Sequence, residues 1–201
     1  MMNRAQDRIQ VKRNRLTVYE MTLTGLMAAV LCVLGPVSLV IGVSPVPISL
    51  GTLAVCLAAA VLGPRLGTLS CLLYLLLGLA GLPVFTGYTG GAGKLMGPTG
   101  GYLIGYLPLA LTAGFAAARP GRGGWRRQAA AAAGMALGTL VLYLFGTLWL
   151  AYGSGMGFYE ALWAGVIPFI PGDLVKMAAA ALLGTTLRAR LIRAGLLDGT
   201  H

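Results

Sequence analysis

Charged residues are scarce in this chain: only 10% of its 201 residues are Asp, Glu, Lys or Arg, and just five are acidic. Soluble domains carry about 25% charged residues, so these few cannot cover the surface of a water-soluble globule. His201 is the only histidine, and the three cysteines lack metal-ligand spacing. These shortages exclude cytosolic enzymes, nucleic-acid-binding modules, metal centres and disordered chains. We interpret the cysteines, which lie in apolar runs, as small packing residues: Cys32, Cys56 and Cys71.

Apolar residues are abundant, at 57% of the chain, with a mean hydropathy of +0.82. A membrane-spanning helix needs about 20 mostly apolar residues, and backbone groups in lipid must bond within their own segment. We therefore predict an all-α integral membrane protein with six transmembrane helices. One transmembrane domain, 20–187, is expected between a basic segment, 1–19, and a tail, 188–201. The six stretches are 20–42, 47–63, 65–80, 99–117, 129–150 and 161–187.

Positive charge predicts the orientation. If the N-terminus is cytoplasmic, 13 of the 15 basic residues fall in inner segments, and the outer loops hold only Lys94. This is the positive-inside pattern, so both termini are predicted to be cytoplasmic. Topology explains these charges, and binding of anionic lipid or of a partner is the alternative. The inner residues are Arg4, Arg8, Lys12, Arg13, Arg15, Arg65, Arg119, Arg122, Arg126, Arg127, Arg188, Arg190 and Arg193.

A glycine-rich segment, 81–102, joins the third and fourth stretches on the outer side, with seven glycines between positions 87 and 101. A phosphate-binding loop would require Gly at 88 and Ser or Thr at 95, where the chain has Tyr88 and Leu95. Two interpretations stay open, a flexible loop and a folded lid over a ligand. A lid would supply the candidate binding residues Phe85, Tyr88, Gly91, Lys94 and Tyr102.

The last apolar stretch begins with two ionisable residues, Asp173 and Lys176, which share a helix face at a spacing of three. Eleven residues separate Lys176 from Arg188, about 17 Å of helix, so the pair is expected in the outer half of the membrane. Ionisable side chains there cost at least ~2.5–3.5 kcal/mol each and usually face a cavity. We predict a polar ligand or ion site, with a self-neutralised structural pair as the alternative. Pro171 is suited to open this helix, whose positive end favours Asp173 or a bound anion.

These residues lie in strings that resemble the BioY family, the biotin-binding S-components of energy-coupling factor (ECF) transporters. Residues 97–105 read GPTGGYLIG and residues 170–176 read IPGDLVK; residues 62–67 (LGPRLG) and 81–85 (GLPVF) match as well. The strings occur in family order, and the resemblance covers roughly residues 20–187. One position departs: the family often has Gln where this chain has Gly51, which removes a polar contact there.

The resemblance implies a multi-pass protein of the prokaryotic cytoplasmic membrane that captures biotin from outside. It implies no enzymatic activity and no cofactor, because ATP is used by two ATPase subunits that act with a transmembrane T-component. The resemblance implies that Asp173 and Lys176 bind the ligand. It implies the same role for Lys94 less directly. The resemblance also implies a partner contact on the first helix, where small residues recur at helical spacing; internal packing is the alternative. These residues are Gly25, Ala28, Ala29 and Cys32.

Two other functions are weighed against this one. A stand-alone secondary transporter of biotin or another vitamin would use Asp173 and Lys176 as a proton relay. A membrane-embedded transferase would need paired carboxylates or a Ser/His constellation, which the sequence lacks.

Biotin fits the residue chemistry independently of the resemblance. A carboxylate suits its ureido N–H groups, ammonium groups suit its valerate carboxylate, and apolar residues suit the rest of the molecule.

Overall fold

A main helix overlaps each of the six predicted apolar stretches. The structure, a computed structural model, describes residues 16–39, 46–119 and 124–197. Parts of the predicted terminal segments, and basic residues such as Arg122, therefore lie outside the described residues. The main helices are α2 (Val18–Leu34), α3 (Gly51–Leu62), α4 (Pro64–Leu79), α6 (Gly100–Ala117), α7 (Trp125–Ser154) and α9 (Ile170–Arg193).

Shorter elements connect these helices. Strands β1 (Ser38–Leu39) and β2 (Ile48–Ser49) form a small antiparallel ribbon before α3, with Ser38 opposite Ser49. Helix α5 (Ala92–Met96) lies in the glycine-rich segment. Helix α8 (Phe158–Gly165) and the 3-10 turn η1 (Ile167–Phe169) divide the sixth stretch before α9 begins. The all-α prediction is confirmed, with the two-residue strands as a minor addition.

The helices have the length and surface of a membrane protein. Among the described residues, three helical segments are long and apolar enough to cross a bilayer: Gly100–Ala117, Trp125–Ser154 and Phe158–Arg193. Helices α2, α3 and α4 are apolar but shorter, so the count of six spans stays a prediction. Large aliphatic side chains are exposed along α4, α7 and α9, which suits contact with lipid. They include Leu72, Leu76, Leu137, Leu140, Leu148, Leu182 and Leu183.

Local signals explain where two helices begin. Thr17 and Glu20 form a capping box at the start of α2: the Glu20 N–H donates to Thr17 Oγ1 at 3.2 Å, and the Thr17 N–H donates to Glu20 Oε2 at 2.7 Å. Between α3 and α4, Gly63 adopts a φ of 86°, a value that favours glycine. Pro64 then opens α4, where its missing N–H needs no partner.

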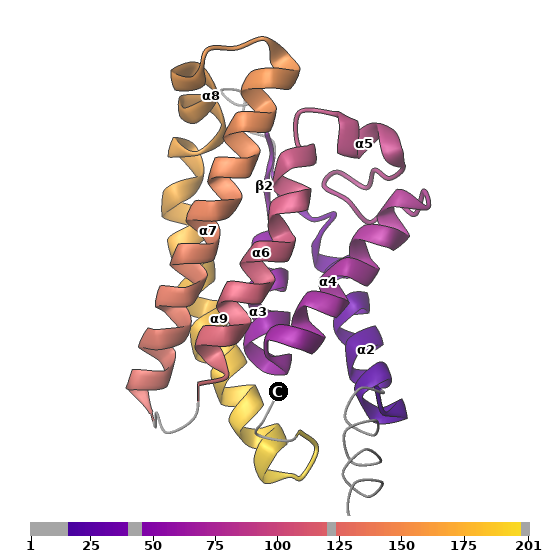
Figure 1. The fold of residues 1–201 in the computed structure, drawn as a ribbon, viewed down its shortest axis with the longest axis vertical. Coiled ribbons are helices and arrows are strands. Elements are labelled where there is room, and N and C mark those ends of the chain that lie inside the picture. The colour runs from indigo at the N-terminus through magenta and orange to yellow at the C-terminus, as the bar shows by residue number, and fades with distance from the viewer. Residues whose placement is uncertain (1–15, 40–45, 120–123, 198–201) are drawn as a thin grey trace, which may run out of the picture.

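Helices α6 and α7 pack closely along their length, side by side in Figure 1. Glycines of α7 face α6: a Cβ on Gly138 would collide with Thr112, and one on Gly146 would collide with the ring of Tyr102. Glycine at these positions lets the two backbones approach. This contact holds Tyr102 firmly against α7, which matters for the site described below.

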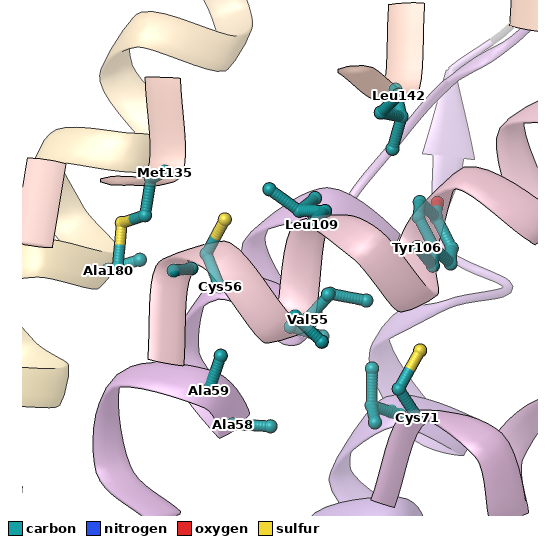
Figure 2. Close-up of a cluster of buried hydrophobic side chains, with 14 of the residues drawn as sticks. Val55, Cys56, Ala58, Ala59, Cys71, Tyr106, Leu109, Met135, Leu142 and Ala180 are labelled. Atoms are coloured by element: carbon teal, nitrogen blue, oxygen red, sulfur yellow. The ribbon is translucent and has the colours of Figure 1, made fainter. Parts of the chain in front are cut away.

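The core lies between α3, α4, α6, α7 and α9, and Figure 2 shows its centre. Cys56 and Cys71 are buried there as free thiols among aliphatic side chains, in agreement with their interpretation as packing residues. Arg188 is also buried, and its Nη1 donates to the Val61 carbonyl at 3.0 Å. This arginine therefore caps the C-terminal end of α3, and α9 continues past the expected boundary at 187 to Arg193.

The two ends of the bundle differ. The start of α2 and the end of α9 lie at the same end, the lower one in Figure 1, while α5 and α8 lie at the opposite end. We call these the α2/α9 end and the α5/α8 end. The positive-inside pattern predicts that the α2/α9 end is cytoplasmic, and this orientation stays a prediction.

Candidate functional site

Asp173 and Lys176 form an ion pair at the start of α9, with 2.9 Å between Lys176 Nζ and Asp173 Oδ1. Both side chains are largely buried, with exposed fractions of 7% for Asp173 and 12% for Lys176. Asp173 accepts two further hydrogen bonds: Tyr143 Oη donates to Oδ2 at 2.6 Å, and Thr52 Oγ1 donates to Oδ1 at 3.2 Å. Three donors from three helices therefore hold one carboxylate in place.

Lys176 joins this pair to the segment before α3. Its Nζ donates to the Ser49 carbonyl at 2.7 Å and lies 3.5 Å from Thr52 Oγ1. Helix α9 supplies both charged residues because Asp173 and Lys176 are one turn apart in it. Helix α3 packs against α9 and places Thr52 beside them. The ammonium group is thus satisfied without water, as a buried charge requires.

A cavity surrounds the pair and has room of about 40 Å³ for the centres of water-sized molecules. Thr99 Oγ1 is buried in the wall and has no hydrogen-bond partner among the described residues. The wall combines aromatic and aliphatic side chains with a serine, three threonines and the ion pair, and is formed by Val46, Pro47, Ser49, Thr52, Thr86, Thr99, Tyr102, Leu103, Tyr106, Leu142, Tyr143, Phe169, Asp173 and Lys176.

Gly51, where the resembled family often has Gln, faces Tyr106. A Cβ at this glycine would collide with Tyr106 Oη and would lie 3.1 Å from the ring atom Cζ and 3.2 Å from Ser49 Oγ. Tyr106 is buried and lines the cavity. In this chain the space beside position 51 is therefore filled by the tyrosine hydroxyl, which brings a polar group to the same part of the wall.

The structure brings together three of the predicted binding residues, Asp173, Lys176 and Tyr102, which all line the cavity. Tyr102 Oη donates to the Gly165 carbonyl at 2.9 Å, so its ring forms the wall while its hydroxyl holds the end of α8. Lys94, in α5, and Gly91, just before α5, are partly exposed and do not line the cavity. The Gly91 N–H donates to the Gly78 carbonyl at 2.7 Å.

The other two predicted residues lie away from the cavity. Phe85 is completely buried and packs edge-to-face against Tyr74, with ring centroids 5.6 Å apart. Tyr88 is 69% exposed, with a φ of 57°. The Phe85 N–H bonds to the Thr89 carbonyl, and the Gly87 N–H bonds to the Pro36 carbonyl. The glycine-rich segment is therefore folded onto the bundle, with Phe85 as its anchor and Tyr88 at its surface.

The small residues of α2 divide between two faces. Gly25 and Ala29 are exposed, and nothing lies within 4 Å of a Cβ built on Gly25. Ala28 is buried, and Cys32 is partly buried and packs against the core. Helix α2 contacts α3 and α4 and lies at the edge of the bundle in Figure 1. Ala28 and Cys32 thus face the bundle, and Gly25 and Ala29 face away from it.

Several cavity residues were missed by the sequence analysis. Tyr143 lies in the middle of an apolar stretch, and a hydroxyl at that depth is a signal that a polar partner lies nearby. Thr52 and Ser49 flank Gly51, which the sequence analysis considered only for the missing Gln. Thr99 belongs to one of the strings that carry the resemblance, and Phe169 immediately precedes the other, but nothing in the sequence indicates that their side chains share one wall.

A bundle of apolar helices that holds a buried ion pair at a cavity defines a membrane-embedded binding or transport protein, not a soluble catalyst. The sequence model of the BioY family matches residues 6–193. The chain therefore belongs to the BioY family.

Related proteins agree with this assignment. The chain is 41% identical over 169 residues to the probable biotin transporter BioY of Pyrococcus horikoshii, covering 84% of this chain and 96% of that one. It is also 41% identical over 172 residues to the biotin transporter BioY of Rhizobium etli, covering 82% and 90%. Among solved structures, it resembles the S-component for biotin from an ECF-type ABC transporter, with a TM-score of 0.77 and 30% identity, covering 87% of this chain and 95% of that one.

Proposed function

We propose that this chain is a membrane S-component that binds biotin in the cavity around Asp173 and Lys176 and carries it across the membrane. The observation that carries the proposal is the pairing of these two largely buried residues in a mostly apolar cavity. The chain acts as a transport subunit and not as an enzyme. Family membership and the relatives that are named biotin transporters support the choice of ligand.

The polar groups of the cavity match those of biotin. The ureido ring has two N–H donors and one acceptor, and the Asp173 carboxylate is a suitable acceptor for the N–H groups. Lys176 is a suitable donor to the valerate carboxylate or to the ureido oxygen. Thr99 Oγ1 has no partner among the described residues and gains one when a polar ligand enters. The aromatic rings of Tyr102 and Phe169 suit the thiolane ring and the alkyl chain.

The ion pair also explains how the cavity is tolerated before the ligand arrives. A single buried charge is far more costly than a pair with additional hydrogen bonds. Asp173 has three donors and Lys176 has at least two acceptors, so the empty site is electrically neutral. Binding then exchanges some of these contacts for contacts with the ligand. The net affinity depends on this exchange and not on the ion pair alone.

Ligand entry is proposed from the α5/α8 side. Thr86 and Thr99, from the glycine-rich segment, and Phe169, from η1, form part of the cavity wall. This segment and α8 lie at the end of the bundle opposite the C-terminal end of α9. The positive-inside pattern predicts that this end faces outward. Lys94, Tyr88 and Gly91 are then placed at the outer surface, where they act on entry and not as groups of the cavity wall.

Energy is proposed to come from partner subunits, because the sequence has no nucleotide-binding motif. A transmembrane T-component and two ATPases would supply it. The exposed small residues Gly25 and Ala29 on α2 are the proposed contact with the T-component, because small residues permit close approach of a second helix. Ala28 and Cys32 pack within the chain instead.

A binding assay of the purified protein tests the ligand. Isothermal titration with biotin, desthiobiotin, thiamine and riboflavin should show a preference for biotin, and desthiobiotin should compete because it retains the ureido ring. Tight binding of thiamine or riboflavin with no binding of biotin would contradict the proposal. Proteoliposomes test the energy source: uptake should require the T-component and ATPases with ATP, whereas uptake by the chain alone under a pH gradient would favour a secondary transporter.

A further inference from the structure

A second hollow lies at the α2/α9 end, far from the biotin site. Between the start of α7 and the last turns of α9, it has room of about 420 Å³ for the centres of water-sized molecules. We call it the basic cleft. Three of its eight lining residues are arginines, and the lining is completed by small or polar residues: Gly124, Arg127, Gln128, Thr185, Thr186, Ala189, Arg190 and Arg193.

The arginines of the basic cleft have no carboxylate partner among the described residues. Arg127 Nε donates to the Ala117 carbonyl at 3.3 Å, while Arg190 and Arg193 are exposed. The acids of the described part of the chain are elsewhere: Glu20 caps α2, Glu160 caps α8, and Asp173 pairs with Lys176. Three guanidinium groups that share one hollow repel each other, so a bound anion would stabilise this arrangement.

The shape and the backbone of the basic cleft also suit an anion. Arg190 and Arg193 are one turn apart on α9, so they present guanidinium groups on one face. Gly124, the N-cap of α7, lies in the lining and brings no side chain to the helix start. The first N–H groups of a 30-residue helix carry partial positive charge. A phosphate group has the charge and the acceptor oxygens to bind guanidinium groups and such a helix start together.

The position of the basic cleft points to lipid as the source of the phosphate. Leu183 and Leu187, two turns and one turn before Arg190 on α9, are exposed by 56% and 43%. Trp125, at the start of α7, is 73% exposed, as is typical of a side chain at a membrane interface. We infer that the basic cleft binds the phosphate headgroup of an anionic phospholipid, with its acyl chains lying along these leucines. Basic pockets between membrane helices on the cytoplasmic side are known to suit such headgroups.

Native mass spectrometry of the detergent-purified protein tests this inference. Added phosphatidylglycerol or cardiolipin should remain bound at collision energies that release phosphatidylcholine. The double variant Arg190→Gln with Arg193→Gln should bind the anionic lipids about tenfold to thirtyfold more weakly. The control variant Arg65→Gln with Arg119→Gln removes the same charge from exposed positions outside the cleft, and it should bind like the unmodified protein.

A third variant tests the shape without changing charge. Ala189→Phe fills the basic cleft and should also weaken anionic lipid binding, while the thermal unfolding temperature of each variant without added lipid reports on folding. Equal losses in the cleft and control variants would overturn the inference, because net charge alone would then explain binding. Displacement of the lipid by an equal concentration of inorganic phosphate would overturn the assignment to lipid, since acyl chains would then contribute nothing.

Discussion

Tyr143 Oη lies 2.6 Å from Asp173 Oδ2, and this hydrogen bond joins α7 to the first turn of α9. The phenol leaves Oδ1 to Lys176 and Thr52, so the two carboxylate oxygens have different partners. Tyr143 therefore acts as a positioning residue for the acceptor that we propose for the ureido ring.

We expect Tyr143→Phe to weaken biotin binding by about tenfold, because a hydrogen bond to a charged group is lost and the carboxylate gains freedom. Isothermal titration of the purified variant measures the effect. Tyr152→Phe, on an exposed side chain near the end of α7, is the matched control and should bind normally. Unchanged affinity of Tyr143→Phe for biotin would show that the Tyr143 hydroxyl does not contribute to binding.

Asp173→Asn and Lys176→Met should each weaken biotin binding by roughly 10–150-fold, the equivalent of a charge-assisted hydrogen bond of about 1.5–3 kcal/mol. Comparing biotin with biotin methyl ester assigns their roles, because the ester keeps the ureido ring and lacks the anionic carboxylate. Asp173→Asn should weaken both ligands alike, whereas Lys176→Met should weaken free biotin more if it binds the valerate. If both variants lose the two ligands equally and also melt earlier, the pair is structural.

The two faces of α2 should respond differently to added bulk. Gly25→Leu with Ala29→Leu, on the exposed face, should leave biotin binding nearly unchanged and abolish ATP-dependent uptake with the partner subunits. Ala28→Leu, on the buried face, should lower the free energy of unfolding by about 1–3 kcal/mol through overpacking. Binding, uptake and thermal unfolding measured on the same preparations distinguish these effects. Loss of biotin binding in the Gly25/Ala29 variant would indicate an internal packing role.

Gly51 should tolerate a side chain only if Tyr106 gives way. Gly51→Ala is expected to cost about 1–3 kcal/mol of unfolding free energy, because its Cβ collides with the Tyr106 hydroxyl. Combining it with Tyr106→Phe removes that hydroxyl and should recover part of the loss. A double-mutant cycle on thermal unfolding measures this coupling. Strictly additive effects would show that the two residues do not compete for the space.

Cysteine labelling tests the orientation of the helices. In a variant with Cys32, Cys56 and Cys71 replaced by alanine, cysteines at Thr89 and Ser154 should react with an impermeant maleimide added to intact cells. A cysteine at Arg119 should react only after permeabilisation, because the positive-inside pattern places it in the cytoplasm. Reaction at Arg119 from outside would contradict the predicted topology.

The sequence alone predicted the class of protein, the main helices and the shared helix face of Asp173 and Lys176, because each depends on local chemistry. Lipid forces backbone groups to bond within their own segment, so an apolar run is sufficient to predict a helix. Asp173 and Lys176 lie one turn apart in one helix, so helical geometry alone makes them neighbours. The strings around them were sufficient to indicate the family, which the comparisons confirmed.

Only the tertiary structure decided which side chains complete the cavity and which leave it. Thr52 and Asp173 are 121 positions apart, and their contact depends on how α3 packs against α9. The sequence does not distinguish Phe85 from Tyr88, because both are aromatic residues of one segment. The fold buries Phe85 against Tyr74 and exposes Tyr88. The composition of a segment limits which contacts its side chains can make. Which of these contacts form depends on how the helix faces pack against one another, and this packing involves all helices of the bundle together.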